Sequence, residues 1–156
     1  MPPEPSQDLA HLLSHAERRL VERLSAVLTQ EGCSVEQWRV LSIAADGEGH
    51  PMTEIAEYAL MPAPSMTKLV DRMVADNLVY RRADPADRRR VLLYLSDRGR
   101  VLHERTAHRV QAEQTRLLEA IDDHGELTRA LSFLTVALAE KPSVRSGRKA
   151  ERASSA

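Results

Sequence analysis

The sequence predicts a mostly α-helical fold that contains one small β-hairpin, and three observations indicate it. The 156 residues are 42% hydrophobic, which is enough for one compact domain to bury a core. Only 3% are aromatic, so aliphatic side chains and alanine must fill that core, as they do between packed helices. Apolar residues recur every three or four positions along most of the chain and alternate only between residues 78 and 95.

The N-terminal part of the chain predicts a long amphipathic helix. A proline-rich leader at residues 1–6 is expected to be flexible, and the helix follows over residues 7–30. Gly32 ends it. Its apolar positions fall at three- and four-residue steps and comprise Leu9, Leu12, Leu13, Ala16, Leu20, Leu24, Val27 and Leu28.

A capping box predicts the start of the second helix. Ser34 lies three residues before Gln37, an arrangement in which each side chain bonds to the other residue's backbone N–H. The helix is expected to extend to Gly47 and to bury Val35, Trp38, Leu41 and Ala45. Residues 46–51, with the sequence DGEGHP, are expected to form a turn.

Two further helices are predicted over residues 52–60 and 64–77, separated by the segment MPAP. Pro64 suits the first turn of a helix, where its missing N–H would have no partner. The second of these helices has an apolar face made of Met66, Leu69, Val70 and Met73. That face leaves Ser65, Lys68 and Arg72 exposed, with Thr67 at its border.

The apolar period then changes from helical to alternating. Residues 78–82 predict one strand, and residues 91–95 predict a second with Val91, Leu93 and Leu95 on one face. The intervening sequence ADPADR is typical of a turn. The segment therefore predicts a β-hairpin with charged residues at its tip.

Two helices close the predicted fold, one over residues 96–122 that Ser96 caps and one over residues 127–138. We expect a globular domain over residues 34–95 and a helical dimerisation region made of residues 7–30 and 96–140. Residues 141–156 are polar and basic and are expected to be disordered. The leucines that we expect to form the dimer interface are Leu9, Leu12, Leu13, Leu127, Leu131, Leu134 and Leu138. Helical packing within one chain is the alternative.

Charge is distributed unevenly along a chain whose net charge is only -1. Residues 1–60 hold four Arg against ten Asp and Glu, whereas residues 78–100 hold seven Arg against three Asp. Such local asymmetry matters because a polyanion senses the nearest face of a protein within a Debye length. The arginine-rich hairpin therefore indicates a polyanionic partner.

Three short helices followed by a hairpin are the arrangement of a winged helix-turn-helix domain, in which the helix over residues 64–77 would enter the major groove of double-stranded DNA. Its exposed residues Ser65, Thr67, Lys68 and Arg72 can bond to phosphates or base edges. Arginines of the hairpin, which we call the wing, can reach the minor groove and nearby phosphates, namely Arg81, Arg82, Arg88, Arg89 and Arg90. Asp87 could orient the guanidinium of Arg89. The alternative is that these charges only keep an exposed helix and hairpin soluble.

Residues 64–100, PSMTKLVDRMVADNLVYRRADPADRRRVLLYLSDRGR, closely resemble the MarR family of bacterial transcriptional regulators. The resemblance includes the D-x-R of the wing at Asp87–Arg89 and the L-S/T-x-x-G start of the next helix at Leu95–Gly99. It implies a homodimer that places two winged domains on successive major grooves of a pseudo-palindrome. Arg89 resembles the wing-tip arginine of that family, and Ser65, Thr67 and Lys68 lie where the family contacts DNA.

The chain departs from the family pattern at two places. Asn77 stands where the family usually has glycine, a mild change because asparagine also tolerates the left-handed conformation that ends a helix. Pro62 and Pro64 flank the start of the recognition helix and bear on which bases it can reach. With these departures, the resemblance implies a repressor that a small-molecule effector of unknown identity controls.

The resemblance also implies an effector pocket, which we expect Trp38 to line, and no cofactor. A redox or metal sensor of the same fold, or a winged domain that binds protein, is the alternative. Cys33 has an acidic neighbour and no adjacent cation to lower its pKa, so a packed role is expected. The six histidines are expected to bind no metal.

Other classes of protein are not indicated. The sequence has no Gly-rich phosphate loop, no G-x-S-x-G and no paired cysteine motif, so we expect no enzymatic activity. No apolar stretch approaches the roughly 18 residues of a membrane span. With one cysteine and no signal-peptide pattern, the protein is expected to be cytoplasmic.

Overall fold

The computed structural model describes residues 8–139 and confirms a mostly helical fold with a small antiparallel sheet. The expected leader at residues 1–6 and the expected basic tail at residues 141–156 lie outside these residues. The chain divides into two compact units at Arg116 and Leu117, and each is described by itself. Among the described residues, no helix has the length and the apolar character needed to cross a membrane.

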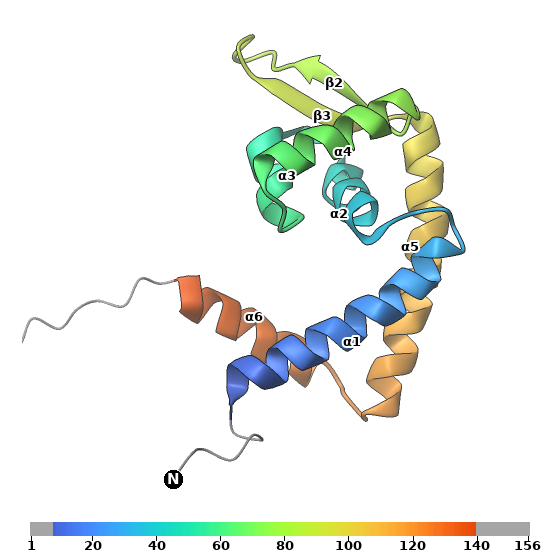
Figure 1. Cartoon of the computed structure of the whole chain (residues 1–156), viewed down its shortest axis with the longest axis vertical. Helices are drawn as coiled ribbons and strands as arrows, with labels where there is room; N and C mark the ends of the chain where they lie inside the picture. Colours follow the sequence, from blue (N-terminus) through green and yellow to red (C-terminus); the bar gives the residue numbers. More distant parts are fainter. Residues whose placement is uncertain (1–7, 140–156) are drawn as a thin grey trace, which may run out of the picture. The chain divides into compact units, whose positions relative to one another are not determined.

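The first unit contains the segments that the sequence predicts as a winged helix-turn-helix (Figure 1). Its helices are α1 (Leu9–Thr29), α2 (Val35–Ile43), α3 (Met52–Tyr58), α4 (Ala63–Ala75) and the larger part of α5 (Asp97–Ala120). The second unit contains the end of α5 and α6 (Glu126–Ala139). The expected helix ends are close to these, except that α2 stops at Ile43 and continues as a short 3₁₀ turn, Ala44–Asp46.

The sheet has three strands where the sequence predicts two. Strands β2 (Val79–Ala83) and β3 (Val91–Leu95) form the expected hairpin, which lies beside α4 in Figure 1. The turn expected over residues 46–51 covers only residues 46–49, and the expectation is wrong for the last two residues because β1 (His50–Pro51) pairs with β3 on the side opposite β2. Pro51 is compatible with this position because β1 is an edge strand.

The buried core lies among α2, α3, α4 and the sheet. The apolar face expected for α4 is fully or almost fully buried, and so are the α2 positions Val40 and Leu41. By contrast, α1 contributes Leu28 as its one buried residue, and its other core-facing residues are only partly buried. The core therefore fixes α4 and the hairpin firmly and the N-terminal half of α1 weakly.

The chain returns from α4 into β2 through a left-handed residue. Asn77 has a φ of 56° and Leu78 N–H donates to the carbonyl of Met73, which is the hydrogen bond of a Schellman motif. Asparagine pays little for this conformation because its short polar side chain tolerates it. Asn77 therefore adopts the left-handed conformation expected at this position.

The same turn holds the start of α5. Ser96 Oγ donates to the Asn77 carbonyl at 2.6 Å and accepts the N–H of Gly99 at 3.0 Å, while the Ser96 N–H donates to the Leu78 carbonyl at 3.1 Å. Gly99 sits directly against Leu78: a Cβ on Gly99 would lie 1.9 Å from the Leu78 carbonyl oxygen. We call these four residues, Asn77, Leu78, Ser96 and Gly99, the wing junction. It requires glycine because no side chain fits there.

A histidine connects strand β1 to α3. In β1, His50 has its Nε2 2.9 Å from Asp46 Oδ1 and its Nδ1 3.2 Å from Glu54 Oε1. Burial opposes protonation of the ring, but the hydrogen bonds to the two carboxylates outweigh it and raise the pKa of His50. The Glu48 backbone N–H and the His50 ring together lower the pKa of Asp46. Both ring nitrogens face a carboxylate, so the arrangement favours the doubly protonated ring.

Helices α1 and α5 are joined by ion pairs. The carboxylate of Glu31, whose side chain is 5% exposed, pairs with both Arg105 and Arg109. Farther along the two helices, Arg23 pairs with Glu113. These contacts attach the α1–α2 connection to the part of α5 that follows the wing junction.

Replacing Gly99 with alanine should destabilise the protein strongly. The new Cβ collides with a backbone carbonyl that cannot rotate away, so the junction must open, at a cost of about 1–3 kcal/mol or more. Urea unfolding followed by circular dichroism measures the loss. The neighbouring exposed Arg98→Ala should change the unfolding free energy by less than about 0.5 kcal/mol. Equal stability of the two variants would contradict the packing described for Gly99.

Replacing His50 with glutamine should have a pH-dependent cost. A group whose pKa is raised in the folded state adds stability that is fully present below its ordinary pKa and is lost as the pH rises through the raised value. The difference in unfolding free energy between the wild type and His50→Gln should therefore be larger at about pH 6 than at about pH 9. The same difference at both pH values would show that the carboxylates do not favour the charged ring.

Candidate nucleic-acid interface

Helix α4 presents one polar face and is held by its opposite face. Met66, Leu69, Val70 and Met73 are buried, whereas the predicted DNA-contacting residues are all exposed, namely Ser65, Thr67, Lys68 and Arg72. Pro62 is the N-cap residue of the helix, and Pro64 lies in its first turn. Backbone N–H groups at these positions have no partner within a helix, so a proline, which lacks the N–H, costs no helical hydrogen bond there. The helix can therefore offer polar side chains without disturbing its packed face.

The turn between α3 and α4 is fixed from α2. Arg39 of α2 donates from Nη1 to the carbonyl of Ala59, the C-cap residue of α3, at 3.1 Å. Leu60 follows with a φ of 56°, a left-handed conformation that is unusual for leucine. The bond from Arg39 satisfies a carbonyl at the end of α3 and holds the turn that sets the direction of α4.

The face of α4 has two flanks. Ser65, Lys68 and Arg72 line a groove of about 700 Å³ whose other wall includes Ser34 and Gln37 at the start of α2. Thr67 and Asp71, one helical turn apart, lie on the side of the helix away from Ser65 and Arg72. Asp71 is not among the predicted site residues.

The tip of the wing is an ordered turn. The main chain closes on itself through two hydrogen bonds of 2.9 Å, from the Asp84 N–H to the Arg90 carbonyl and from the Arg90 N–H to the Asp87 carbonyl. Two aspartate side chains add to this, since Asp84 accepts the N–H of Ala86 at 2.8 Å and Asp87 accepts the N–H of Arg89 at 3.0 Å. Both are bonds of the kind found in Asx-turns.

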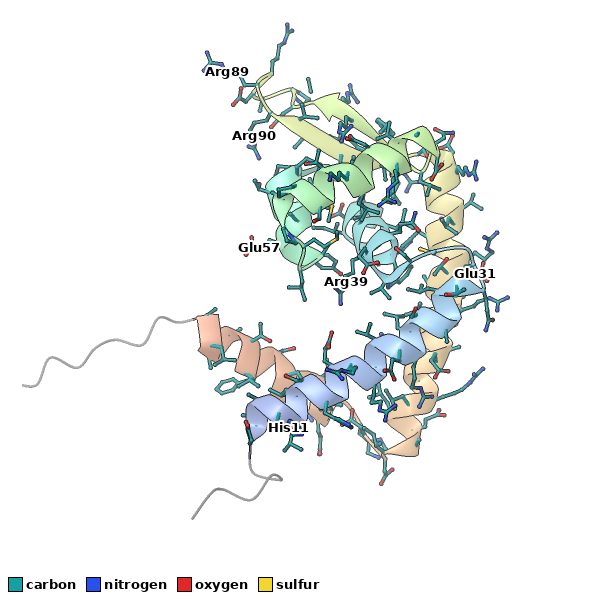
Figure 2. All side chains as sticks on the ribbon, viewed as in Figure 1. His11, Glu31, Arg39, Glu57, Arg89 and Arg90 are labelled. Carbon is teal, nitrogen blue, oxygen red and sulfur yellow. The ribbon has the colours of Figure 1, made fainter. Side chains whose placement is uncertain are left out.

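Asp87 thus makes a different contact from the expected one. The sequence suggests a charge pair with the guanidinium of Arg89, but the Asp87 carboxylate accepts the backbone N–H of that residue. Within residues 8–139 no salt bridge involves Asp87. Figure 2 shows Arg89 and Arg90 at the tip of the hairpin, beyond the ends of the strands. Asp87 orders the backbone that carries these arginines and leaves the side chain of Arg89 unpaired.

The wing arginines fall into two groups. Arg90 lies 3.7 Å from the Asp84 carboxylate, and Arg81 forms a shorter pair of 2.6 Å with Asp71 of α4. Over the described part of the chain, no salt bridge takes up Arg82, Arg88 or Arg89, and the same holds for Lys68 and Arg72 of α4. A set of unpaired cations therefore lies on the recognition helix and the wing.

Cys33, which the sequence offers as a possible redox sensor, is buried. Burial raises the pKa of the Cys33 thiol to about 11, and its Sγ donates to the Ser34 carbonyl at 3.4 Å. A thiol with this pKa is almost fully protonated at neutral pH and is a poor nucleophile. Among residues 8–139, no group of three His, Cys, Asp or Glu side chains is placed to hold a metal ion.

Trp38 packs against α5. Its ring stacks on His103 with centroids 5.1 Å apart and planes inclined by 9°. Burial lowers the pKa of His103, which favours the neutral ring in the stack. A separate groove of about 710 Å³ lies between α1 and the start of α2, and Trp38 is not among the residues that line it.

The leucines predicted to form a dimer are largely uncovered. Leu9 and Leu12 in α1 are 57% and 48% exposed, and Leu13 is half-buried. In α6, no residue is buried, and the exposed large apolar side chains are Leu127, Leu131, Phe133, Val136 and Leu138. Leu134 is half-buried.

Comparisons with known proteins agree on one family. The model of the MarR family matches residues 31–90 of this chain. The crystal structure of the MarR family transcriptional regulator SPO1453 from Silicibacter pomeroyi DSS-3 is 32% identical, with a TM-score of 0.78, and the match covers 86% of this chain and 98% of that one. Most of this chain therefore shares its fold with a solved member of that family.

Two further relatives are transcriptional regulators, and structures of one of them show what that protein binds. The HTH-type transcriptional regulator FarR of Neisseria gonorrhoeae is 27% identical over 109 residues, which are 70% of this chain and 75% of that protein. The structure of CouR from Rhodococcus jostii RHA1 bound to p-coumaroyl-CoA is 25% identical, with a TM-score of 0.79 and coverage of 91% and 99%. CouR, a transcriptional repressor, also has a structure on a 23-mer DNA duplex, which matches at 26% identity with a TM-score of 0.74 and coverage of 90% and 98%.

Replacing Asp87 with alanine should loosen the wing tip without unfolding the protein. The Arg89 N–H loses its acceptor, so the amides of Arg89 and Arg90 should exchange with solvent faster, as NMR or mass spectrometry can measure. The melting temperature should change by less than about 3 °C because the residue is exposed. Asp76→Ala, another exposed aspartate, should leave those amides unchanged. Unaltered exchange in Asp87→Ala would contradict the ordering role.

Proposed function

This chain belongs to the MarR family of transcriptional regulators, and we propose that it is a ligand-responsive repressor that binds a pseudo-palindromic promoter site as a homodimer. In this proposal α4 enters the major groove and contacts bases and phosphates through Ser65, Thr67, Lys68 and Arg72. The wing contacts the minor groove and its phosphates through Arg82, Arg88, Arg89 and Arg90. Arg81, the fifth predicted wing arginine, differs from these because its partner, Asp71, belongs to α4, whereas Arg90 pairs within the wing with Asp84.

The observation that carries this proposal is the set of unpaired cations on α4 and the wing. Lys68, Arg72, Arg82, Arg88 and Arg89 are exposed, and none of them joins a salt bridge within residues 8–139. A protein gains affinity for DNA mainly when its cations displace counterions from phosphates, and a cation already neutralised by a carboxylate displaces few. These five residues fit that role, since no carboxylate of the described residues pairs with their charges.

The apolar surface of the terminal helices supports the homodimer. Helix α6 has 14 residues, most of them apolar, and none of its side chains is buried. A helix of this composition is stable when another surface covers its apolar side chains. Leu127, Leu131 and Leu138 are 43%, 42% and 73% exposed, and Leu9 and Leu12 of α1 add to the uncovered leucines. A second copy of the chain would cover such a surface, and two-fold symmetry would present two winged domains to two half-sites.

Response to an effector is supported by the relatives and by one stacked pair. CouR binds p-coumaroyl-CoA, an aromatic acyl thioester. In this chain the space between α2 and α5 is occupied by Trp38 stacked on His103, so a planar ligand that entered there would have to separate the two rings. We propose that an aromatic effector competes with this stack. Because Trp38 is the single tryptophan, its fluorescence would report such binding.

DNA binding should depend on Arg89. A duplex selected by the wild type from a random pool is the probe, and fluorescence anisotropy over a salt series is the measurement. Arg89→Ala should weaken binding about tenfold or more and should reduce the salt slope by about 1.8, because the homodimer loses two unpaired cations and each contributes about 0.9 to the slope. Arg19→Ala, an exposed arginine on α1, is the matched control and should change neither quantity.

The same preparation tests the other parts of the proposal. Sedimentation should give a dimer, and the titration with the selected duplex can be repeated in the presence of p-coumaroyl-CoA to look for release. If the selection yields no duplex that the wild type binds more tightly than random DNA, the protein is not a sequence-specific regulator. A protein partner for the wing would then be the better hypothesis.

A further inference from the structure

One ion pair joins the recognition helix to the wing. Arg81 Nη2 donates to Asp71 Oδ1 at 2.6 Å, with Arg81 in the middle of β2 and Asp71 in the third turn of α4. In the sheet, Arg81 lies opposite Leu93 of β3, and Leu93 lies opposite His50 of β1. The pair therefore connects α4 to the central row of the three-stranded sheet.

Arg81 differs in its surroundings from the other cations of the interface. Its side chain is 34% exposed, and the Asp71 carboxylate beside it is 58% exposed. Arg82, its neighbour in the strand, has no carboxylate partner within residues 8–139. At distances of several ångströms, the charges of a close Arg–Asp pair largely cancel, so a phosphate there is neither strongly attracted nor strongly repelled.

Asp71 also has an effect of its own on the face of α4. It lies one turn after Thr67 and three residues after Lys68, so its carboxylate belongs to the surface that the proposed function places against DNA. An unpaired carboxylate there would repel phosphates. Its pairing with Arg81 reduces that repulsion and, at the same time, fixes its position relative to β2.

We propose that Arg81 is a positioning residue for DNA binding and not a phosphate contact: with Asp71 it sets the distance and angle between the recognition helix and the wing. This inference rests on the proposed function, since it concerns how DNA is bound. Thr67 and Lys68 on α4 and Arg89 on the wing tip must reach adjacent grooves of the same duplex simultaneously. A connection that fixes α4 against β2 lowers the entropy that binding would otherwise have to remove.

The test is a double variant that keeps the net charge, Asp71→Asn/Arg81→Gln. Because the two residues act through each other, the double variant should bind the selected duplex about two- to fivefold more weakly than the wild type, the range expected for an exposed ion pair. Its salt slope should equal that of the wild type, since neither residue contacts a phosphate. Arg89→Ala, measured in parallel, provides the slope change of about 1.8 that the loss of one phosphate contact in each copy of the homodimer produces.

Each other result overturns the inference. A slope reduced by about 1.8 in the double variant, which is about 0.9 for each copy of Arg81 in the homodimer, would make Arg81 a direct phosphate contact. Wild-type affinity in the double variant would mean that the pair does not position anything. Failure of the wild type to bind any selected duplex would instead contradict the proposed function, and the two failures are therefore distinguishable.

A measurement without DNA keeps the inference testable in that case as well. Hydrogen exchange of the free protein should be faster at the β2 amides of the double variant than of the wild type, because the ion pair no longer holds the strand to α4. A substitution of two exposed residues by amides of similar size should leave the melting temperature within about 3 °C. Equal exchange in β2 would show that the pair does not restrain the wing.

Discussion

The close approach of Gly99 to the Leu78 carbonyl is the constraint on which the interface depends. At that point the end of α4, the start of β2, the end of β3 and the start of α5 meet, and Ser96 bonds to both Asn77 and Leu78. A close backbone packing of this kind leaves no room for a side chain and little freedom for the joined elements to shift. The recognition helix and the wing are therefore carried by α5 as one body. Structures of some members of this family hold small-molecule ligands, and in this chain any motion of α5 at the wing junction would move α4 and the wing together.

The carboxylates near the interface form hydrogen bonds and ion pairs within the protein, whereas several of its cations remain unpaired among the described residues. Asp84 and Asp87 accept backbone N–H groups of the wing tip, and Asp71 pairs with Arg81. At strand β1, Asp46 and Glu54 pair with His50. None of these acids neutralises Arg82, Arg88 or Arg89 in the part of the chain that the structure describes. The near-zero net charge of the chain is compatible with a local positive surface, because residues 78–100 hold seven Arg against three Asp while residues 1–60 hold an excess of acids.

Features that depend on residues close in sequence could be predicted, whereas contacts between segments that are distant in the sequence could not. The helical period of α4, the capping box at Ser34 and the left-handed Asn77 each depend on residues close in sequence. Strand β1 has only two residues and no alternation, so its pairing with Leu92 and Leu93 carries no local pattern. The same holds for the pairing of Asp71 with Arg81, which depends on how α4 lies against β2. Closeness in sequence is not always enough. The spacing of Asp87 and Arg89 indicates a pair of side chains, but the sequence does not tell whether the carboxylate accepts a hydrogen bond from the guanidinium or from the backbone N–H.

Hydroxyl-radical footprinting on the selected duplex tests the central claim most directly, since it reports where a rigid pair of recognition helix and wing touches each strand. The account predicts two symmetric protected regions whose centres are about one helical turn apart, roughly 10 base pairs, each flanked by protection in the minor groove where a wing lies. A single unsymmetric protected region, or protection of the major groove without the flanking minor groove, would contradict a dimer that presents helix and wing as one unit.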